Sequence, residues 1–191
     1  NCVIIYIMNI FILDNDPVKA AQLQCDKHIP KMVVESAQML STVHRMIDGT
    51  MERRPSKSGS MLQYFKLDDY REDILYKAVH MNHPCTVWSR ENCSNYDWHY
   101  KHFIALCDEY TYRYGKVHAS ETKLATVLRN APKKIKHTTG KSPFRLAMGS
   151  NPECMFEDAV KSYRAFYQTK QARFAMKWTK RKQPEWFHAI V

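Results

Sequence analysis

The sequence predicts a mainly α-helical protein, with one compact domain over residues 1–191, a short extended segment at its amino end and a basic helix and tail at its carboxyl end. Three observations favour this class. Five glycines and eight prolines are too few for a loop-rich all-β fold. A hydrophobic content of 45% over this length is enough for one core. Helix-start and helix-end residues bracket stretches of helical length.

The amino end is the segment with extended character. Val3–Leu13 consists almost entirely of β-branched, aromatic and other apolar residues, a composition typical of a buried strand or of an extended segment that covers helices. It has neither a basic region nor a small-residue cleavage site, so we expect no secretory signal. We expect the sequence to be a fragment, or to have its natural start at Met8.

Two helices should follow this segment. Asp16 can cap a helix over Pro17–Lys27, because its side chain can accept from free backbone N–H groups and a proline suits the first helical position. Pro30 should break or kink that helix. A second helix is expected over Lys31–Ile47, with Gly49 as its end.

Loops and helices alternate along the rest of the chain. Residues 50–60 are polar and contain a proline and a glycine, so a mobile loop is expected there. Residues 130–152 indicate a basic loop or a short helix, and 177–191 a basic tail. Gly115 should end one helix and Ser120 should cap the next. The expected helices are Asp69–Val79, Ser94–Tyr114, Glu121–Arg129 and Glu157–Met176.

The net charge of +10 is unevenly distributed. Residues 1–128 hold 15 Lys and Arg against 15 Asp and Glu, whereas residues 129–191 hold 14 against four. We therefore expect a neutral helical body at 8–128 with a basic part packed on it. An electropositive face suits a polyanion, here nucleic acid and most simply double-stranded DNA. The alternative is a solvated basic surface without a specific partner.

The cysteines and the hydropathy indicate the cellular compartment in which the protein is expected. Six cysteines occur without a C-x-x-C pair, and a chain of this size needs no disulfide to fold. Reduced thiols in the cytoplasm, the host cytoplasm if the protein is viral, are therefore expected, and secretion is not. No apolar run reaches the length of about 20 residues that a bilayer requires, so no membrane association is expected; the oligomeric state stays open.

A polar stripe on the second predicted helix is the first candidate for chemistry. Its spacing of 4, 3 and 4 residues places the side chains on one helix face: Lys31, Glu35, Gln38 and Thr42. The plain interpretation is a surface ion pair between Lys31 and Glu35. The functional one is a catalytic carboxylate beside an amine, in a cleft that His28 lines and Lys27 flanks.

A second candidate is the segment Asn82-His83-Pro84-x-x-x-Trp88. Pro84 can open a helix, so Asn82 and His83 would lie at a helix N-terminus, where backbone N–H groups favour anions such as phosphate. A histidine can act as acid or base, and an exposed tryptophan can stack on a base. The alternative is a capping turn followed by a core tryptophan.

No metal or cofactor is expected. His99 and His102 are spaced as two metal ligands, but no third ligand is evident from spacing. Walker, G-x-G-x-x-G and G-x-S-x-G motifs are absent from the sequence. Nucleotide-driven motors, dinucleotide oxidoreductases and α/β-hydrolases are therefore excluded.

The basic carboxyl end is a candidate nucleic-acid contact. Its aromatic residues have core-like spacing, while its cations would face outward and bind phosphates without reading sequence. The predicted nucleic-acid-binding residues are Arg164, Lys170, Arg173, Lys177, Lys180, Arg181 and Lys182.

These features occur in an order that resembles a known family. The order is M-N-I-F, then K-x-x-x-E-x-x-Q-M-L, N-H-P-x-x-x-W and A-L-C-x-E-Y. It resembles an uncharacterised family of helical phage and large-virus proteins and is more distantly similar to pyrimidine-dimer DNA glycosylase-like proteins. The resemblance covers about residues 8–115, with a looser match near Trp186. It implies an all-helical fold that binds duplex DNA and flips a nucleotide.

The resemblance also implies a mechanism. Glu35 takes the place of that enzyme family's first-helix glutamate. In the family, an α-amine freed by Met removal attacks the sugar C1′ and forms a Schiff base. This sequence departs from that pattern, because Asn9 follows Met8 and seven residues precede Met8. The amine would come from Lys31 or from the amino terminus, or an activated water would replace it.

The expected function is therefore glycosylase-like cleavage of an N-glycosidic bond in damaged or modified DNA, as hydrolase or lyase. The expected catalytic residues are Glu35, Lys31 and His83, and the expected substrate contacts are His28, Lys27, Gln38, Asn82 and Trp88. Two alternatives remain: a non-catalytic nucleic-acid-binding or virion-associated protein, and a small nucleotide-processing enzyme.

Overall fold

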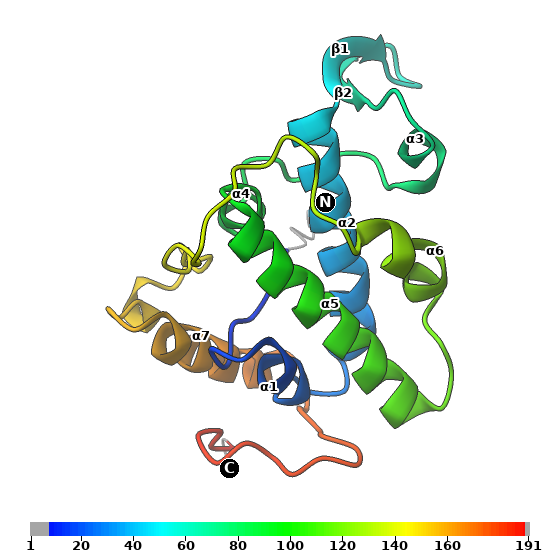
Figure 1. Ribbon diagram of the computed structural model, residues 1–191. Coiled ribbons are helices and arrows are strands. Elements are labelled where there is room, and N and C mark those ends of the chain that lie inside the picture. Colours follow the sequence, from blue (N-terminus) through cyan, green and yellow to red (C-terminus); the bar gives the residue numbers. More distant parts are fainter. Residues whose placement is uncertain (1–7, 190–191) are drawn as a thin grey trace.

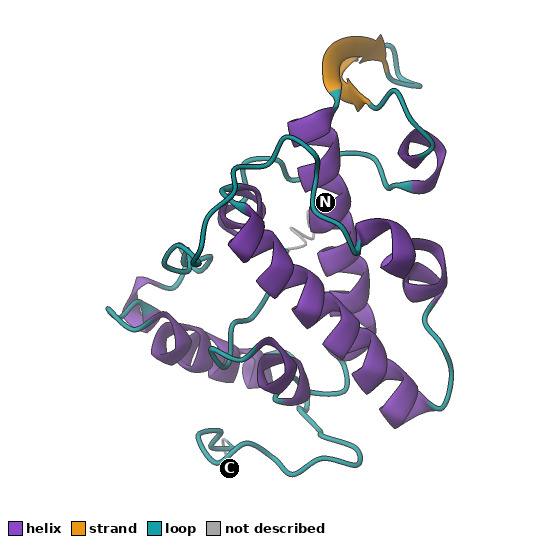
Figure 2. Ribbon diagram, viewed as in Figure 1, coloured by secondary structure: helices purple, strands orange, loops and turns teal. Residues whose placement is uncertain are grey.

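The computed structural model describes residues 8–189. Within them lie seven α-helices and one two-stranded sheet (Figure 1). Figure 2 shows that the strands are confined to a single hairpin at one end of the molecule. The prediction of a mainly α-helical protein is confirmed for this part of the chain.

Two long helices form the centre of the fold. They are α2 (Ile29–Asp48) and α5 (Cys93–Tyr114), and they pack against each other. The shorter helices α1 (Pro17–Gln22), α4 (Pro84–Arg90) and α6 (Ala119–Leu128) pack on this pair. The apolar face of α2 is fully buried and consists of Val33, Ala37, Leu40 and Val43.

The amino-terminal apolar segment is buried but is not a strand over residues 8–13; the rest of the expected strand, residues 3–7, lies outside the described residues. Phe11 has a φ of 54°, which interrupts regular extended backbone. The side-chain amide of Asn9 donates to the Ala147 carbonyl at 3.0 Å, and Arg164 donates to the Leu13 carbonyl at 2.9 Å. The segment therefore runs between α2 and the carboxyl-terminal third.

The first helix is capped as expected but is shorter. Asp16 accepts hydrogen bonds from the backbone N–H groups of Val18 and Lys19 at 2.9 and 2.8 Å. The prediction that the helix reaches Lys27 is wrong, because tertiary partners take the backbone groups that would extend it: Tyr167 OH accepts from the Cys25 N–H.

Pro30 lies at the start of α2 and, contrary to the expectation, does not break or kink the helix before it. It lies in the first turn of α2, where its missing N–H costs no hydrogen bond. Gly49 ends α2 as expected, and its N–H donates to the Arg45 carbonyl at 2.9 Å.

Residues 50–60 do not form the expected mobile loop. They contain β1 (Thr50–Pro55), which pairs antiparallel with β2 (Met61–Lys66). A short turn joins the strands, with Gly59 at a φ of 86°. The hairpin leaves the carboxyl end of α2 and projects from the helical body (Figure 1).

The helix expected at 69–79 is reduced to a single turn, α3 (Arg71–Ile74). Arg45, which is buried on α2, accounts for the difference. Its guanidinium donates to the carbonyls of Glu72, Leu75 and Tyr76, so those carbonyls bind a side chain instead of a following helical turn.

The later helices follow the prediction with shifted ends. Gly115 ends α5 with a φ of 69°, the left-handed conformation expected at that position. His118, not Ser120, caps α6, because its Nδ1 accepts from the Ser120 N–H at 3.0 Å. The last α-helix, α7 (Ala159–Gln168), is shorter than expected and continues as a 3₁₀ turn over Thr169–Ala172.

The carboxyl-terminal third wraps around the helical body (Figure 1). Residues 129–151 run as a loop past the end of α2, where Asp48 accepts from the N–H groups of Lys133 and Lys134 at 2.9 Å. A 3₁₀ turn at Pro152–Cys154 leads to α7. None of the helices in the described part is both long and apolar enough to cross a membrane, and the five cysteines described there are free.

Candidate functional site

A cleft of about 410 Å³ opens beside the first two turns of α2. Three residues of the predicted polar stripe line it, so the i, i+4 spacing placed them correctly on one face. The cleft is completed from outside α2 by the buried amino-terminal segment and by the loop before α4. Its lining residues are Met8, Lys31, Val34, Glu35, Gln38 and His80.

Glu35 is the buried carboxylate of this cleft. Its side chain is only 8% exposed, and Oε1 lies 3.3 Å from the Lys31 Nζ. The Asn9 backbone N–H donates to Oε2 at 3.1 Å. Burial raises the pKa of Glu35, while the charge of Lys31 and the Asn9 hydrogen bond oppose that rise. Such a carboxyl group keeps its proton to a higher pH than an exposed glutamate does, which suits it to donate a proton to a bound molecule.

Lys31 forms the rim of the cleft. Its side chain is 39% exposed, so its ammonium group can reach both Glu35 and a molecule in the cleft. An amine beside a buried carboxyl group, both facing one cavity, is the arrangement that proton transfer or covalent catalysis needs.

Thr42, the last residue of the polar stripe, fixes the far wall of the cleft. It is buried on α2, and its Oγ1 accepts from the Val79 N–H at 3.0 Å. This bond holds the loop against α2, so that His80 lines the cleft with a φ of 48°. A non-glycine residue at positive φ is uncommon and concentrates at functional sites.

His83 lies next to the cleft without lining it. It caps α4 by accepting from the Cys85 N–H at 3.2 Å, and it hydrogen-bonds to the Met8 backbone. Burial and the neighbouring His80 lower its pKa. Asn82 is exposed in the turn between these two histidines.

His28 and Lys27 belong to an aromatic cluster behind the cleft. The His28 ring stacks on Phe11 with 4.9 Å between centroids, and Nδ1 lies 2.7 Å from the Tyr167 hydroxyl. Burial lowers the His28 pKa to about 3. The Lys27 ammonium lies 4.9 Å from the centroid of Phe174. The structure therefore places His28 in the core, not in the cleft.

Trp88 is a core residue. It is 1% exposed, packs on Trp98 and Phe144, and donates from Nε1 to the Ser142 carbonyl at 3.2 Å. No ring face is therefore left for a base.

One of the predicted phosphate contacts, Lys170, lies near Lys31 at the rim of the cleft, and Arg173 lies near Lys170. The Lys170 ammonium lies 3.5 Å from the centroid of Phe166. Burial lowers the pKa of Lys170 to about 8, and the positive charges of Arg173 and Lys31 act in the same direction. Three cations near one another, one of them at the rim of the cleft, favour an anion beside it.

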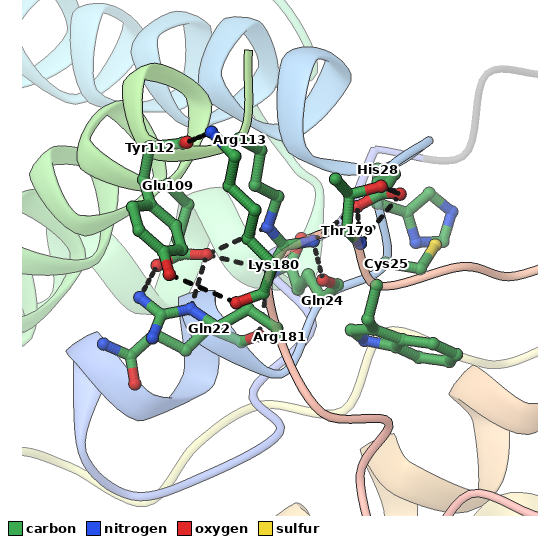
Figure 3. Close-up of polar contacts among 12 residues, drawn as sticks. Gln22, Gln24, Cys25, His28, Glu109, Tyr112, Arg113, Thr179, Lys180 and Arg181 are labelled. Atoms are coloured by element: carbon green, nitrogen blue, oxygen red, sulfur yellow. Dashed lines mark hydrogen bonds and ion pairs between the residues drawn. The ribbon is translucent and has the colours of Figure 1, made fainter. Parts of the chain in front are cut away.

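Other predicted phosphate contacts hold the fold together (Figure 3). Arg181 bonds to Glu109 on α5, with Nη2 2.5 Å from Oε1, and the Lys180 Nζ donates to the Tyr112 carbonyl at 2.7 Å. Arg164 donates to the Leu13 carbonyl. Lys177 and Lys182 are exposed and remain accessible to a polyanion.

The two histidines weighed as metal ligands are hydrogen-bonded core residues. His99 Nδ1 lies 2.7 Å from the Ser89 hydroxyl. His102 lies 2.9 Å from the Pro17 carbonyl and 3.2 Å from the Ile10 carbonyl. Among the described residues, no three His, Cys, Asp or Glu side chains are grouped so that they could hold a metal ion.

Three residues of the site were not predicted. Met8, Asn9 and His80 reach Glu35 or the cleft only through tertiary packing. The sequence carries one signal for them, since His80 stands three residues before the singled-out His83.

Comparison of the chain with protein-family models, curated proteins and solved structures finds no match. The residues of the cleft are therefore the basis for assigning a function.

Proposed function

We propose that this chain is a DNA-processing enzyme that cleaves an N-glycosidic bond in damaged or modified DNA. Glu35 is the general acid and base, Lys31 supplies the amine, and Gln38, which lines the same cleft, contacts the substrate. The single observation that carries the proposal is the buried Glu35 carboxyl group, 3.3 Å from a lysine amine in a cleft of about 410 Å³. In a viral or phage infection the enzyme would act in the host cytoplasm.

The chemistry follows from that pair. The Glu35 carboxylate takes a proton from the Lys31 ammonium, and the resulting amine attacks the sugar C1′. The C1′–N bond breaks, and its electron pair leaves with the base, which takes up the proton that the attacking nitrogen then loses. Glu35 gives its proton to the sugar ring oxygen as the ring opens to the imine. A water activated by Glu35 would give hydrolysis without an imine.

A backbone amine is the other candidate nucleophile. Met8 lines the cleft, and the Asn9 nitrogen lies 3.1 Å from the Glu35 Oε2. In a polypeptide that starts at either residue, the α-amine would occupy the position that Lys31 approaches from the rim. Either amine would form an imine with C1′ that borohydride traps. The residue that carries the adduct shows which amine reacted.

Double-stranded DNA is the proposed partner. Lys170 lies near both Lys31 and Arg173. Arg173 is exposed, so it can bind a phosphate that flanks a flipped nucleotide. A basic surface of this kind predicts an affinity that falls steeply with salt.

The test is borohydride trapping on duplex oligonucleotides that carry an abasic site or one of a panel of base lesions. Wild type should give a released base and a covalent adduct. Glu35→Gln should fold normally and lower the rate at least ~100-fold, the contribution typical of a general acid or base. Lys27→Met, which removes a nearby cation outside the cleft, is the matched control and should retain activity.

Peptide mapping of the adduct identifies the amine as Lys31 or an α-amine. If wild type yields neither base, nick nor adduct across the panel, the glycosidic function is rejected. The alternative of a non-catalytic nucleic-acid-binding protein is then favoured. In that case Arg173→Glu would reduce the affinity for nucleic acid and Glu35→Gln would not.

A nucleotide-processing enzyme is the second candidate. The volume of about 410 Å³ is typical of a small-molecule site and would hold one nucleotide. This candidate predicts tight binding of a mononucleotide and little affinity for polymers, which isothermal titration calorimetry with both ligands would decide.

A further inference from the structure

The β1–β2 hairpin plays no part in the cleft, yet it is firmly attached to α2. Arg45 donates to the Phe65 carbonyl at 3.0 Å and to the Glu72 carboxylate at 2.6 Å. The Tyr64 hydroxyl donates to the same carboxylate. At Gly49, the backbones of α2 and β2 approach so closely that a Cβ would lie 2.9 Å from the Lys66 carbonyl oxygen. The base of the hairpin is therefore rigid.

The two faces of the hairpin differ in whether their polar side chains have partners within the protein. On one face, Glu52 and Arg54 form an ion pair at 2.6 Å, and the Arg54 guanidinium lies 3.7 Å from the centroid of Tyr64. The cross-strand register pairs Glu52 with Tyr64, so these side chains satisfy one another.

The opposite face carries exposed side chains with little to bind on the protein. The register pairs Arg53 with Gln63 and Pro55 with Met61 on this face. Met51 and Met61 are 52% and 55% exposed. Within residues 8–189, the side chain of Arg53 forms no hydrogen bond or ion pair, and neither does that of Lys57 at the turn. We call this surface, made of Met51, Arg53, Met61, Gln63 and the adjoining Lys57, the ribbon face.

The chemistry of the ribbon face matches duplex DNA. A two-stranded β-ribbon fits the major groove of B-DNA. Arginine and glutamine form the bidentate hydrogen bonds that read guanine and adenine edges, and methionine is among the apolar side chains that wedge between base steps. Residues 50–66 hold four Arg and Lys against one Glu, so the charge is complementary to phosphate.

We propose that the ribbon face is a DNA-contacting arm that binds a groove of the duplex outside the cleft. The proposal rests on duplex DNA as the partner of the proposed function. It adds a second contact region, separate from the cleft and from the carboxyl-terminal cations. Because the base of the hairpin is fixed to α2, the arm and Glu35 stand on one rigid helix, and the arm sets the position of the duplex relative to the cleft.

The test measures affinity for an undamaged 20-base-pair duplex by fluorescence anisotropy over a range of KCl concentrations. Arg53→Glu with Lys57→Glu should weaken binding at least tenfold at 100 mM KCl. The slope of log Kd against log salt should decrease by about 2, one for each lost phosphate contact. Lys116→Glu with Lys123→Glu, which changes the net charge equally at exposed sites, is the matched control and should weaken binding less than threefold.

A milder pair of substitutions tests groove binding directly. Arg53→Ala with Gln63→Ala should reduce the preference for the duplex over a single strand of the same sequence, because a single strand offers no groove. Both side chains are exposed, so circular dichroism and the Tm should match wild type. If the hairpin and control pairs weaken binding equally, or if the hairpin pair binds as wild type does, the arm is rejected.

The same proteins separate this inference from the proposed function. In single-turnover trapping at saturating protein, the hairpin variants should react within twofold of wild type, whereas Glu35→Gln should bind DNA normally and fail to react. If the hairpin variants weaken DNA binding but wild type gives no trapped adduct, the arm is supported and the glycosidic function is rejected. If trapping succeeds but the hairpin variants bind normally, only the arm falls.

Discussion

Glu35 combines two opposing electrostatic influences on one side chain. Burial disfavours the carboxylate, while Lys31 and the Asn9 N–H favour it, and burial dominates. The pair at i, i+4 is therefore more than the surface ion pair that its spacing alone would allow, because one partner is buried and the other is not. A carboxyl group in this balance responds strongly to the loss of either stabilising neighbour.

Lys31 is one of the two neighbours that favour the Glu35 carboxylate over its protonated form. Lys31→Met should raise the pKa of Glu35 further, because the neutral side chain removes both a favourable charge and a hydrogen bond while burial remains. NMR titration of the Glu35 side-chain carboxyl carbon measures it. Lys27→Met is the control and should leave the titration unchanged; a Glu35 pKa at or below the wild-type value would contradict the prediction.

At the residue scale, the sequence predicted which face of a helix a side chain lies on better than it predicted which residues that side chain contacts. Helical periodicity placed Lys31, Glu35 and Gln38 on one face, and the structure brings them to one cleft. Periodicity carries no information about tertiary burial, however. His28 and Trp88 were expected at a site, and both lie among aromatic side chains supplied by distant parts of the chain.

The junction between α2 and the hairpin depends on a glycine for space. Gly49→Ala would bring a Cβ within 2.4 Å of the Arg45 carbonyl oxygen and 2.9 Å of the Lys66 carbonyl oxygen. Because both contacts are with backbone, we expect a loss of about 2 kcal/mol in the free energy of unfolding. Urea denaturation measures this loss. Gly140→Ala, at a glycine with open space around it, should change stability by less than about 0.5 kcal/mol.

The attachment of the carboxyl-terminal tail depends on a buried carboxylate. Glu109 bridges Arg181 of the tail and Arg113 of α5, which has a fully buried side chain. Glu109→Gln should destabilise the protein by about 2 kcal/mol, because the buried Arg113 loses one of its two carboxylate partners and keeps only Asp26. It should also speed trypsin cleavage after Arg181, as seen by mass spectrometry. Glu185→Gln, at an exposed site, is the control; equal stability of the two variants would refute this account.

At the element scale, helix ends with a local cause could be predicted and those with a tertiary cause could not. Asp16 caps α1 and Gly115 ends α5 through local backbone chemistry. By contrast, Arg45 takes the carbonyls that would have continued α3. The hairpin was missed because both faces of β1 are largely exposed, so its sequence lacks the alternation that identifies a half-buried strand.

Buried neutral histidines should make the whole molecule sensitive to acid. Burial lowers the pKa of His28 to about 3 and of His44 and His102 to about 4. The unfolded chain, with histidine pKa values near 6.5, therefore binds protons first as the pH falls. Stability should be full above pH 6.5 and should decline from there to about pH 4.

Thermal melts from pH 8 to pH 4 test this prediction. The loss should be on the order of 1 kcal/mol for each histidine at pH 5.5. His28→Phe keeps the ring stack on Phe11 and should make the decline shallower, whereas substitution of the exposed His137 by Gln should not change it. A Tm that is constant between pH 7 and pH 5 would contradict the assignment of neutral buried histidines.

Fewer carboxyl-terminal cations are accessible on the folded molecule than the sequence suggests. Residues 129–191 carry the formal excess, yet Arg164, Lys180 and Arg181 are engaged in contacts within the protein. The total charge could be read from the sequence, but its availability could not, because the acidic and carbonyl partners lie far away in the chain.

The path of the amino-terminal segment also has a consequence for synthesis on the ribosome. Asn9 and Leu13 are held by Ala147 and Arg164, residues that are translated more than a hundred positions later. Because a ribosome adds about 5–20 residues per second, the segment waits several seconds for its partners. Until they emerge, Glu35 lacks a fixed Asn9 N–H beside it, so the cleft is completed only when synthesis has passed α7.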